Sequence, residues 1–161
     1  MAHMLGEDGA ASELAGVAGT VPLLEPAQVV LFSWGAEQAQ PREREAVERL
    51  QLEAIGVDDV SADPPAAAAR ALALLEPADR LLVHFDVDVV DFTDTPLSEN
   101  TGRNEGLTYD DAVRALEILL GSPKLSGLTV TELNPAHVEE GAGSVERLVR
   151  DLSRCLGAGS L

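Results

Sequence analysis

Short apolar runs alternate with segments of helical periodicity along the chain from residue 29 onward. The run Val29–Ser33 is continuously β-prone, which is typical of a strand buried on both faces. A helix that ends at Gly56 is predicted next, because Val47, Leu50 and Ala54 fall on one face at helical spacing. The predicted strands are Val29–Ser33, Val57–Val60, Leu81–Val87 and Leu125–Leu133, and the predicted helices follow Pro41, Pro65, Thr108 and Ser144.

The order of these elements predicts the fold class. Strands that alternate with helices of about 10 to 15 residues form βαβ units, so we expect an α/β fold with a parallel sheet of about four strands flanked by helices. Leu81–Val87 has the strongest strand pattern and is expected at the centre of the sheet, beside Leu125–Leu133. The length of 161 residues suits a single domain that spans 1–161.

The chain is strongly acidic, with 28 Asp and Glu against 11 Lys and Arg and a formal net charge of −17. This charge repels phosphate groups, so neither nucleic acid nor anionic membrane is expected as a partner, whereas small cations and metal ions are favoured. The sequence has no apolar run long enough to span a membrane and no signal-peptide pattern, so a cytoplasmic location is expected. Cys155 is the only cysteine, which excludes an internal disulfide framework.

Two carboxylates stand at the end of the strongest predicted strand. Asp86 and Asp88 are two residues apart, so the alternation of side chains along a strand would point both to the same side. Two like charges at the edge of a core are costly unless a cation neutralises them, and open parallel sheets bind ligands at the carboxyl ends of their strands. Oxygen ligands favour Mg²⁺ or Mn²⁺. The alternative is that one aspartate caps the following loop and the other is solvated.

A third carboxylate, Glu132, lies near the end of the predicted strand Leu125–Leu133. Because successive strands of βαβ units usually lie side by side, Glu132 would face the same crevice as the two aspartates. The alternative is a surface glutamate before an Asn-Pro turn. The polar, glycine-containing loop 100–108 follows the aspartate pair, a position where long loops often line a site, although an ordinary surface loop would look the same.

The remaining chemistry-bearing side chains are interpreted as structural. His84 alternates with Phe85, and we interpret it as a structural histidine whose side chain points away from Asp86. His137 follows the Asn-Pro turn and could reach the crevice, but it is interpreted as solvated. Cys155 falls on the apolar face of the last predicted helix and is expected in the core.

Together these segments resemble the ureohydrolases, the family of arginase, agmatinase and formiminoglutamase. His84–Phe92 is similar to the second metal motif of that family, Phe-Asp-Val-Asp followed by Asp-Pro. Gly106–Thr108 resembles a Gly-Leu-Thr or Gly-Leu-Ser stretch that precedes a helix, and Glu132–Pro135 resembles the Glu-x-Asn-Pro end of a strand. Pro26–Trp34 looks like the family strand upstream of this region, so the resemblance covers nearly the whole chain.

The resemblance implies a three-layer αβα fold of the arginase type and a hydrolase of linear amidines with two Mn²⁺ ions per site. By this resemblance Asp86 is catalytic and bridges the two ions, and Asp88 binds one of them. Glu132 would hold the cationic guanidinium or amidine group of a small substrate, and Thr108 would lie near the pocket wall. Water activated by the ions would attack the guanidinium carbon. Ureohydrolases are commonly homo-oligomers, so self-association is expected.

The resemblance extends only to the carboxyl-terminal half of such an enzyme. The family's Gly-Gly-Asp-His and Asp-x-His-x-Asp metal motifs and its proton-relay histidine have no counterpart in the sequence. Phe92 replaces the proline of the metal motif, and the loop 98–105 differs from that of arginases, which leaves the substrate open. We therefore expect the isolated chain to bind Mn²⁺ weakly and to be inactive.

Two other readings stay open on the sequence alone. The chain could be a non-catalytic remnant or interaction protein that keeps the arginase-type fold and one weak metal site. It could also be a phosphatase of the haloacid-dehalogenase type, whose first motif fits Phe85–Val90. That class needs a downstream lysine and a late acidic pair. Lys124 is the only lysine, and Glu132–Pro135 has no place in that pattern.

Overall fold

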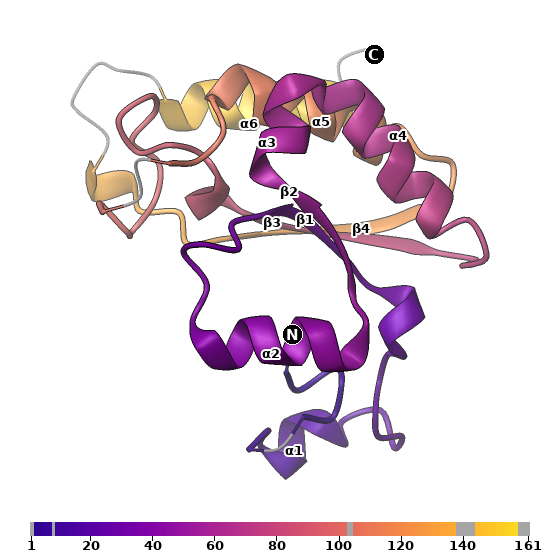
Figure 1. Ribbon diagram of the computed structural model, residues 1–161. Coiled ribbons are helices and arrows are strands. Elements are labelled where there is room, and N and C mark those ends of the chain that lie inside the picture. Colours follow the sequence, from indigo (N-terminus) through magenta and orange to yellow (C-terminus); the bar gives the residue numbers. More distant parts are fainter. Residues whose placement is uncertain (1, 8, 103–104, 138–143, 158–161) are drawn as a thin grey trace.

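Parallel strands lie between helices in the computed structural model, which describes residues 2–7, 9–102, 105–137 and 144–157 (Figure 1). Strand β1 (Val30–Trp34) pairs in parallel with β2 (Glu53–Gly56), and β3 (Leu81–Asp86) pairs in parallel with β4 (Leu125–Thr131). Helices connect the strands of each pair, as parallel pairing requires. The predicted α/β class, with about four parallel strands, is confirmed.

Six α-helices and three 3₁₀ turns are present among the described residues. They are α1 (Ser12–Ala15), α2 (Pro41–Leu50), α3 (Val57–Ala62), α4 (Pro64–Leu74), α5 (Tyr109–Leu120) and α6 (Ser144–Cys155), with η1 (Pro26–Gln28), η2 (Val87–Val89) and η3 (Pro135–His137). Figure 1 shows α3 to α6 on one side of the strands and α2 on the other. Asp63 caps α4 by accepting a hydrogen bond from the Ala66 amide at 3.1 Å.

The second strand lies earlier in the chain than the sequence pattern predicts. The pattern favours a strand at Val57–Val60, but these residues begin helix α3, and Glu53–Gly56 forms the strand instead. Helix α2 stops at Leu50 because Gln51 adopts a left-handed conformation, which frees Ala54 and Ile55 to pair with β1. The prediction was wrong because the apolar pair had been assigned to the end of the preceding helix.

The four strands form two hydrogen-bonded pairs among the described residues, and not one continuous sheet. Strand β3 bonds only to β4 there, so the central position expected for Leu81–Val87 is not observed, although the predicted neighbour is correct. Among the described residues, the core covers one face of β3. Leu81 and Phe85 are buried in the core, whereas Leu82 on the opposite face is 74% exposed. The unbroken apolar run therefore predicts deeper burial of β3 than the structure shows.

A single hydrophobic core lies between the strands and the layer of α3 to α6. It contains Ile55 of β2, Val60 of α3, Phe85 of β3 and Leu116 of α5, all buried. Cys155 of α6 is half-buried and packs against this core, as predicted, and burial raises the pKa of its thiol. The core thus fixes β3 on one face only, and the carboxyl end of β3 is held by the loops described below.

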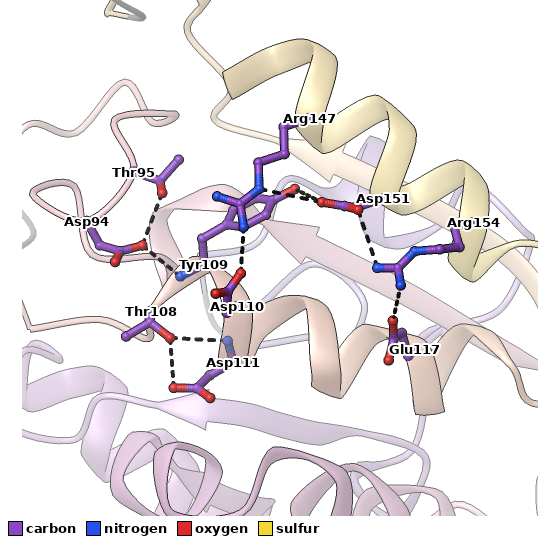
Figure 2. Close-up of polar contacts among 10 residues, drawn as sticks. All are labelled: Asp94, Thr95, Thr108, Tyr109, Asp110, Asp111, Glu117, Arg147, Asp151 and Arg154. Atoms are coloured by element: carbon purple, nitrogen blue, oxygen red, sulfur yellow. Dashed lines mark hydrogen bonds and ion pairs between the residues drawn. The ribbon is translucent and has the colours of Figure 1, made fainter. Parts of the chain in front are cut away.

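Helices α5 and α6 are joined by a network of ionic and aromatic contacts (Figure 2). Tyr109, the first residue of α5, is 2% exposed, and its hydroxyl donates a hydrogen bond to Asp151 at 3.0 Å. The guanidinium of Arg147 lies 4.2 Å from the centre of the Tyr109 ring. Arg154 pairs with both Asp151 and Glu117. Burial raises the pKa of the Tyr109 phenol, and the Asp151 carboxylate raises it further.

Tyr109 should stay protonated in the folded chain at pH values where an exposed tyrosine ionises. A raised pKa in the folded state stabilises the fold below the unfolded-state pKa of about 10, and this contribution is lost as the pH rises above it. Tyr109 is the only tyrosine, so the absorbance of tyrosinate reports it alone. We expect the native chain to titrate at clearly higher pH than the urea-unfolded chain, and coincident curves would contradict the buried hydrogen bond.

Candidate functional site

The pairing of β3 with β4 brings the predicted carboxylates to one edge. Asp86, the last residue of β3, is aligned with Thr131, the last residue of β4, so Glu132 immediately follows the partner of Asp86. Glu132 has a φ of 60°, a left-handed conformation that costs a residue other than glycine about 1–2 kcal/mol. Strained backbone of this kind occurs where surrounding contacts hold a side chain in a particular direction.

Asp86 and Asp88 are linked through the backbone at the end of β3. The strand ends at Asp86 and continues as the 3₁₀ turn η2, so the argument from strand alternation does not apply to Asp88. Instead, the Asp86 carboxylate caps this turn by accepting a hydrogen bond from the Asp88 amide at 3.0 Å. Asp88 is 8% exposed, and its Oδ1 is buried with no hydrogen-bond partner among the described residues. A buried carboxylate oxygen without a partner is unusual and is a natural position for a bound cation.

The turn that carries Asp88 is anchored by apolar side chains and a short backbone bridge. Val87 and Val90 are buried, and Val90 forms a parallel bridge with Leu107. The bridge depends on Gly106, since a Cβ atom at that position would lie 2.5 Å from the Val89 carbonyl oxygen. Part of the loop expected to line the site is therefore packed directly against the aspartate turn. Residues 103 and 104 of that loop lie outside the described residues.

The segment after Val90 is fixed by two further aspartates. The Asp91 carboxylate accepts hydrogen bonds from the hydroxyl of Thr93 at 2.6 Å and from its amide at 2.7 Å, and the hydroxyl bond in particular lowers the pKa of Asp91. Asp94 accepts a hydrogen bond from the Tyr109 amide at 2.9 Å, as Figure 2 shows. Both aspartates therefore stabilise the loop, and Asp94 ties it to the start of α5.

Thr108 is occupied by helix capping. Its hydroxyl accepts a hydrogen bond from the Asp111 amide at 3.1 Å and donates one to the Asp111 carboxylate at 2.8 Å (Figure 2). This confirms the helix start that the sequence predicts. A position of Thr108 near the wall of a substrate pocket stays a prediction.

Two expectations about histidines were wrong, namely the direction of the His84 side chain and the solvation of His137. Residues two apart on a strand share a face, so His84 lies on the same face as Asp86, where it is exposed and contacts the Thr129 hydroxyl at 2.7 Å. His137 is half-buried and hydrogen-bonded, and not solvated. Phe92, which replaces a proline in the metal motif, makes an edge-to-face contact with the His137 ring at 5.9 Å between centroids.

One residue at the end of β1 was not singled out by the sequence. Ser33 has a φ of 59°, and its hydroxyl oxygen is buried without a hydrogen-bond partner in the part of the chain that the structure describes. The loop after β1 contacts the loop before α5, because the side-chain amide of Gln38 donates a hydrogen bond to the Glu105 carboxylate at 3.1 Å. The carboxyl ends of β1 and β3 therefore open toward the same side of the molecule. Only a strained conformation, which no sequence pattern reveals, distinguishes Ser33.

The predicted metal site can be compared with the donor atoms of the described residues. Among residues 2–7, 9–102, 105–137 and 144–157, no group of three or more His, Cys, Asp or Glu side chains is placed to hold a metal ion. The unpartnered Oδ1 of Asp88 and the neighbouring Asp86 carboxylate are oxygen donors of the type that Mn²⁺ and Mg²⁺ accept. The donors that are present fit a hard divalent cation, but two carboxylates do not complete its coordination.

Comparisons with known proteins identify relatives of this arrangement. A family model described as the arginase family matches residues 17–155. An arginase from Bacillus caldovelox superposes with a TM-score of 0.80 at 21% identity, covering 97% of this chain and 51% of its own. An arginase from Bacillus subtilis gives 0.81 at 20% identity, with 97% and 53% covered. A formiminoglutamase from Trypanosoma cruzi, solved with Mn²⁺, gives 0.71 at 21% identity, with 86% and 47% covered.

These superpositions extend over half of the known structures. The chain spans about half the length of each of these three solved proteins, and the similarity establishes the αβα fold. A search of curated proteins found no match. In the part of the chain that the structure describes, no helix has the length and apolar character needed to cross a membrane.

Replacing Gly106 should disturb the aspartate turn. Gly106→Ala places a methyl group against the backbone of residues 89–91, where its Cβ atom would lie 2.7 Å from Asp91 N. We therefore expect the free energy of unfolding to fall by about 2 kcal/mol. Gly102→Ala is the matched control, because its Cβ atom would lie 3.5 Å from Asn100 in ordinary contact. Urea denaturation measures both. Equal stability of the two variants would show that the bridge tolerates a side chain.

The left-handed backbone at Glu132 can be tested with a pair of substitutions. Glycine adopts this conformation without steric strain, whereas alanine retains most of the strain. We therefore expect Glu132→Gly to be more stable than Glu132→Ala by about 1 kcal/mol in urea denaturation. At an ordinary right-handed position alanine is the more stable of the two, so the opposite order would contradict a positive φ at this residue.

Proposed function

The chain belongs to the arginase family, and from this membership we propose that Asp86, Asp88 and Glu132 form part of a manganese-dependent ureohydrolase site. The reaction class is hydrolysis of a guanidino or formimino carbon–nitrogen bond. The haloacid-dehalogenase alternative is dropped, because the family match covers residues 17–155, which include its proposed motif.

One observation carries the proposal for the metal. The Oδ1 atom of Asp88 is buried and has no hydrogen-bond partner among the described residues, and the backbone amide of Asp88 donates a hydrogen bond to the Asp86 carboxylate. A buried acceptor, Asp88 Oδ1, thus lies just beyond the carboxyl end of β3. Open α/β sheets bind their ligands at this end of their strands. A divalent cation would satisfy this acceptor, and Asp86 and Asp88 are the residues that would hold it. Bound Mn²⁺ would lower the pKa of water and so supply a nucleophile near neutral pH.

Glu132 has a separate role in the proposal. Its carboxylate follows the residue that is paired with Asp86, which supports a position for a cationic group beside the two aspartates. A guanidinium or amidine group carries coplanar N–H donors, and a carboxylate can accept two parallel hydrogen bonds from them. The net charge of −17 would attract such a small cation. Thr108 fixes the start of α5 and, in the proposal, lies at the pocket wall.

The site would need ligands beyond those in the described residues. Two carboxylates leave most of the coordination of a hard ion to water, and such ions bind tightly only when several protein oxygens offset the lost hydration. We propose that the rest of an arginase-type fold, in the same polypeptide or in a different one, completes the site. A non-catalytic relative of the family is the alternative, and the experiments below separate the two.

The isolated chain should bind Mn²⁺ weakly and at one place. At physiological salt, which screens the general acidic charge, we expect a dissociation constant of about 0.1–1 mM. Loss of the electron paramagnetic resonance signal of free Mn²⁺ measures it. Asp88→Asn should abolish this binding, whereas Asp79→Asn, which removes an exposed carboxylate elsewhere, should leave it unchanged. Equal effects of the two substitutions would reject the metal assignment.

Catalysis should depend on more than these residues. Incubated with excess Mn²⁺ and arginine, agmatine or formiminoglutamate, the isolated chain should release no urea, ammonia or formamide. A longer polypeptide that contains this chain and the rest of an arginase-type fold should turn over one of these compounds, and Asp86→Ala should abolish the turnover. Robust turnover by the isolated chain would show that other residues complete the site. Failure of the longer protein to bind Mn²⁺ would favour the non-catalytic alternative.

A further inference from the structure

The turn that contains Glu132 is clamped to the segment 97–99 by the backbone. The Glu99 amide donates a hydrogen bond to the Glu132 carbonyl oxygen at 2.8 Å, and the Asn134 amide donates one to the Leu97 carbonyl oxygen at 2.9 Å. These bonds form an isolated antiparallel bridge between Ser98 and Leu133. Segment 97–99 is itself anchored, since Leu97 is fully buried and Ser98 is 1% exposed.

His137 closes this clamp from the far side of the turn. Its Nδ1 lies 2.8 Å from the carbonyl oxygen of Ser98, and its Nε2 lies 3.3 Å from the side-chain nitrogen of Asn134. The ring also contacts the edge of Phe92. One side chain thus joins η3, the Glu132 turn and segment 97–99, of which Leu97 and Ser98 are buried.

The hydrogen-bond partners of His137 are compatible with a single tautomer of its imidazole ring. A carbonyl oxygen can only accept a hydrogen bond, so Nδ1 must carry the proton toward Ser98. The Asn134 side-chain oxygen accepts a bond from the Ala136 amide at 2.8 Å, and its nitrogen donates to the Glu99 carboxylate, so the nitrogen is the atom facing His137. Nε2 of His137 must therefore accept. The neutral Nδ1–H tautomer satisfies every contact.

We infer that His137, as the Nδ1–H tautomer, is a positioning residue that holds Glu132 in its strained left-handed conformation. The inference rests on the proposed function only in giving Glu132 the role of receiving the cationic group. Strain of this kind persists only where neighbouring contacts over-determine the backbone, and His137 supplies one contact to Ser98 on the paired segment and one to Asn134, two residues after Glu132. Without the imidazole, the Ser98 carbonyl loses its side-chain donor and the turn can relax.

The tautomer is tested directly by nitrogen NMR of the imidazole rings in the full chain, without metal or substrate. We expect the His137 spectrum to show a protonated Nδ1 and an unprotonated Nε2. The Nε2–H tautomer, which free histidine prefers, would overturn the inference because it cannot donate to Ser98.

Substitutions that differ in donor position test the positioning role. The side-chain amide nitrogen of asparagine stands at the place of Nδ1 in histidine, whereas that of glutamine stands near Nε2. We expect His137→Ala and His137→Gln to lower the hydrogen-exchange protection of the Glu99 and Asn134 amides about tenfold, the loss expected for one hydrogen bond. His137→Asn should retain most of this protection. The strong intraresidue amide–Hα contact that marks a positive φ at Glu132 should follow the same order.

Two controls separate this effect from general unfolding. His84→Ala removes an imidazole that contacts Thr129 and Thr131 on the strands, and it should leave the amides of Glu99 and Asn134 unchanged. Protection of Leu116, in the core of α5, should be equal in all variants. Equal protection in His137→Asn and His137→Ala would reject the positioning role. Because these measurements need neither Mn²⁺ nor substrate, a failed metal assay would reject the proposed function and leave this result standing.

Discussion

The register of β3 against β4 is the constraint on which the candidate site depends. Asp86 is aligned with Thr131 in a parallel pair, and this alignment places Glu132 at the same edge as the aspartate turn. A slip by one residue would turn Phe85 out of the core and His84 into it. The buried Phe85 ring and the helices above it therefore hold the carboxylates in position.

Beyond the strand ends, the loops are held by backbone contacts and small buried side chains. The bridges Val90–Leu107 and Ser98–Leu133 act as short pieces of sheet between segments that have no regular structure. Buried Leu97 gives the connecting segment an apolar anchor. Functional loops must expose polar groups to a ligand, and an arrangement of this kind keeps them rigid without burying those groups.

The covered and open faces of the strands agree with the extent of the family similarity. The layer of α3 to α6 packs on one face of β3, while Leu82 on the other face is 74% exposed. Parallel strands are normally covered on both faces. The chain also spans about half the length of the arginases that it matches. The open face of β3 thus accompanies a match to about half of each of these arginase structures.

The sequence by itself determined the fold class, the strand order in the chain and the identity of the carboxylates. Apolar runs and caps such as Thr108 act locally, so they can be recognised without knowing what lies nearby. The family resemblance rested on short motifs at strand ends, and the match over residues 17–155 confirmed it. The one misplaced strand, at Val57–Val60, lay where an apolar segment could continue a helix or begin a strand, and only pairing with β1 decides between them.

Tertiary structure decided everything that depends on which neighbours a residue meets. The unpartnered Oδ1 of Asp88 and the positive φ of Glu132 arise from packing between segments far apart in the sequence. His137 looked like a solvated loop residue because its partner, the Ser98 carbonyl, is 39 positions away in the chain. Patterns along a sequence report the local preference of each residue. They do not report the long-range contacts that orient a side chain, and for this reason the candidate residues could be named from the sequence while their geometry could not.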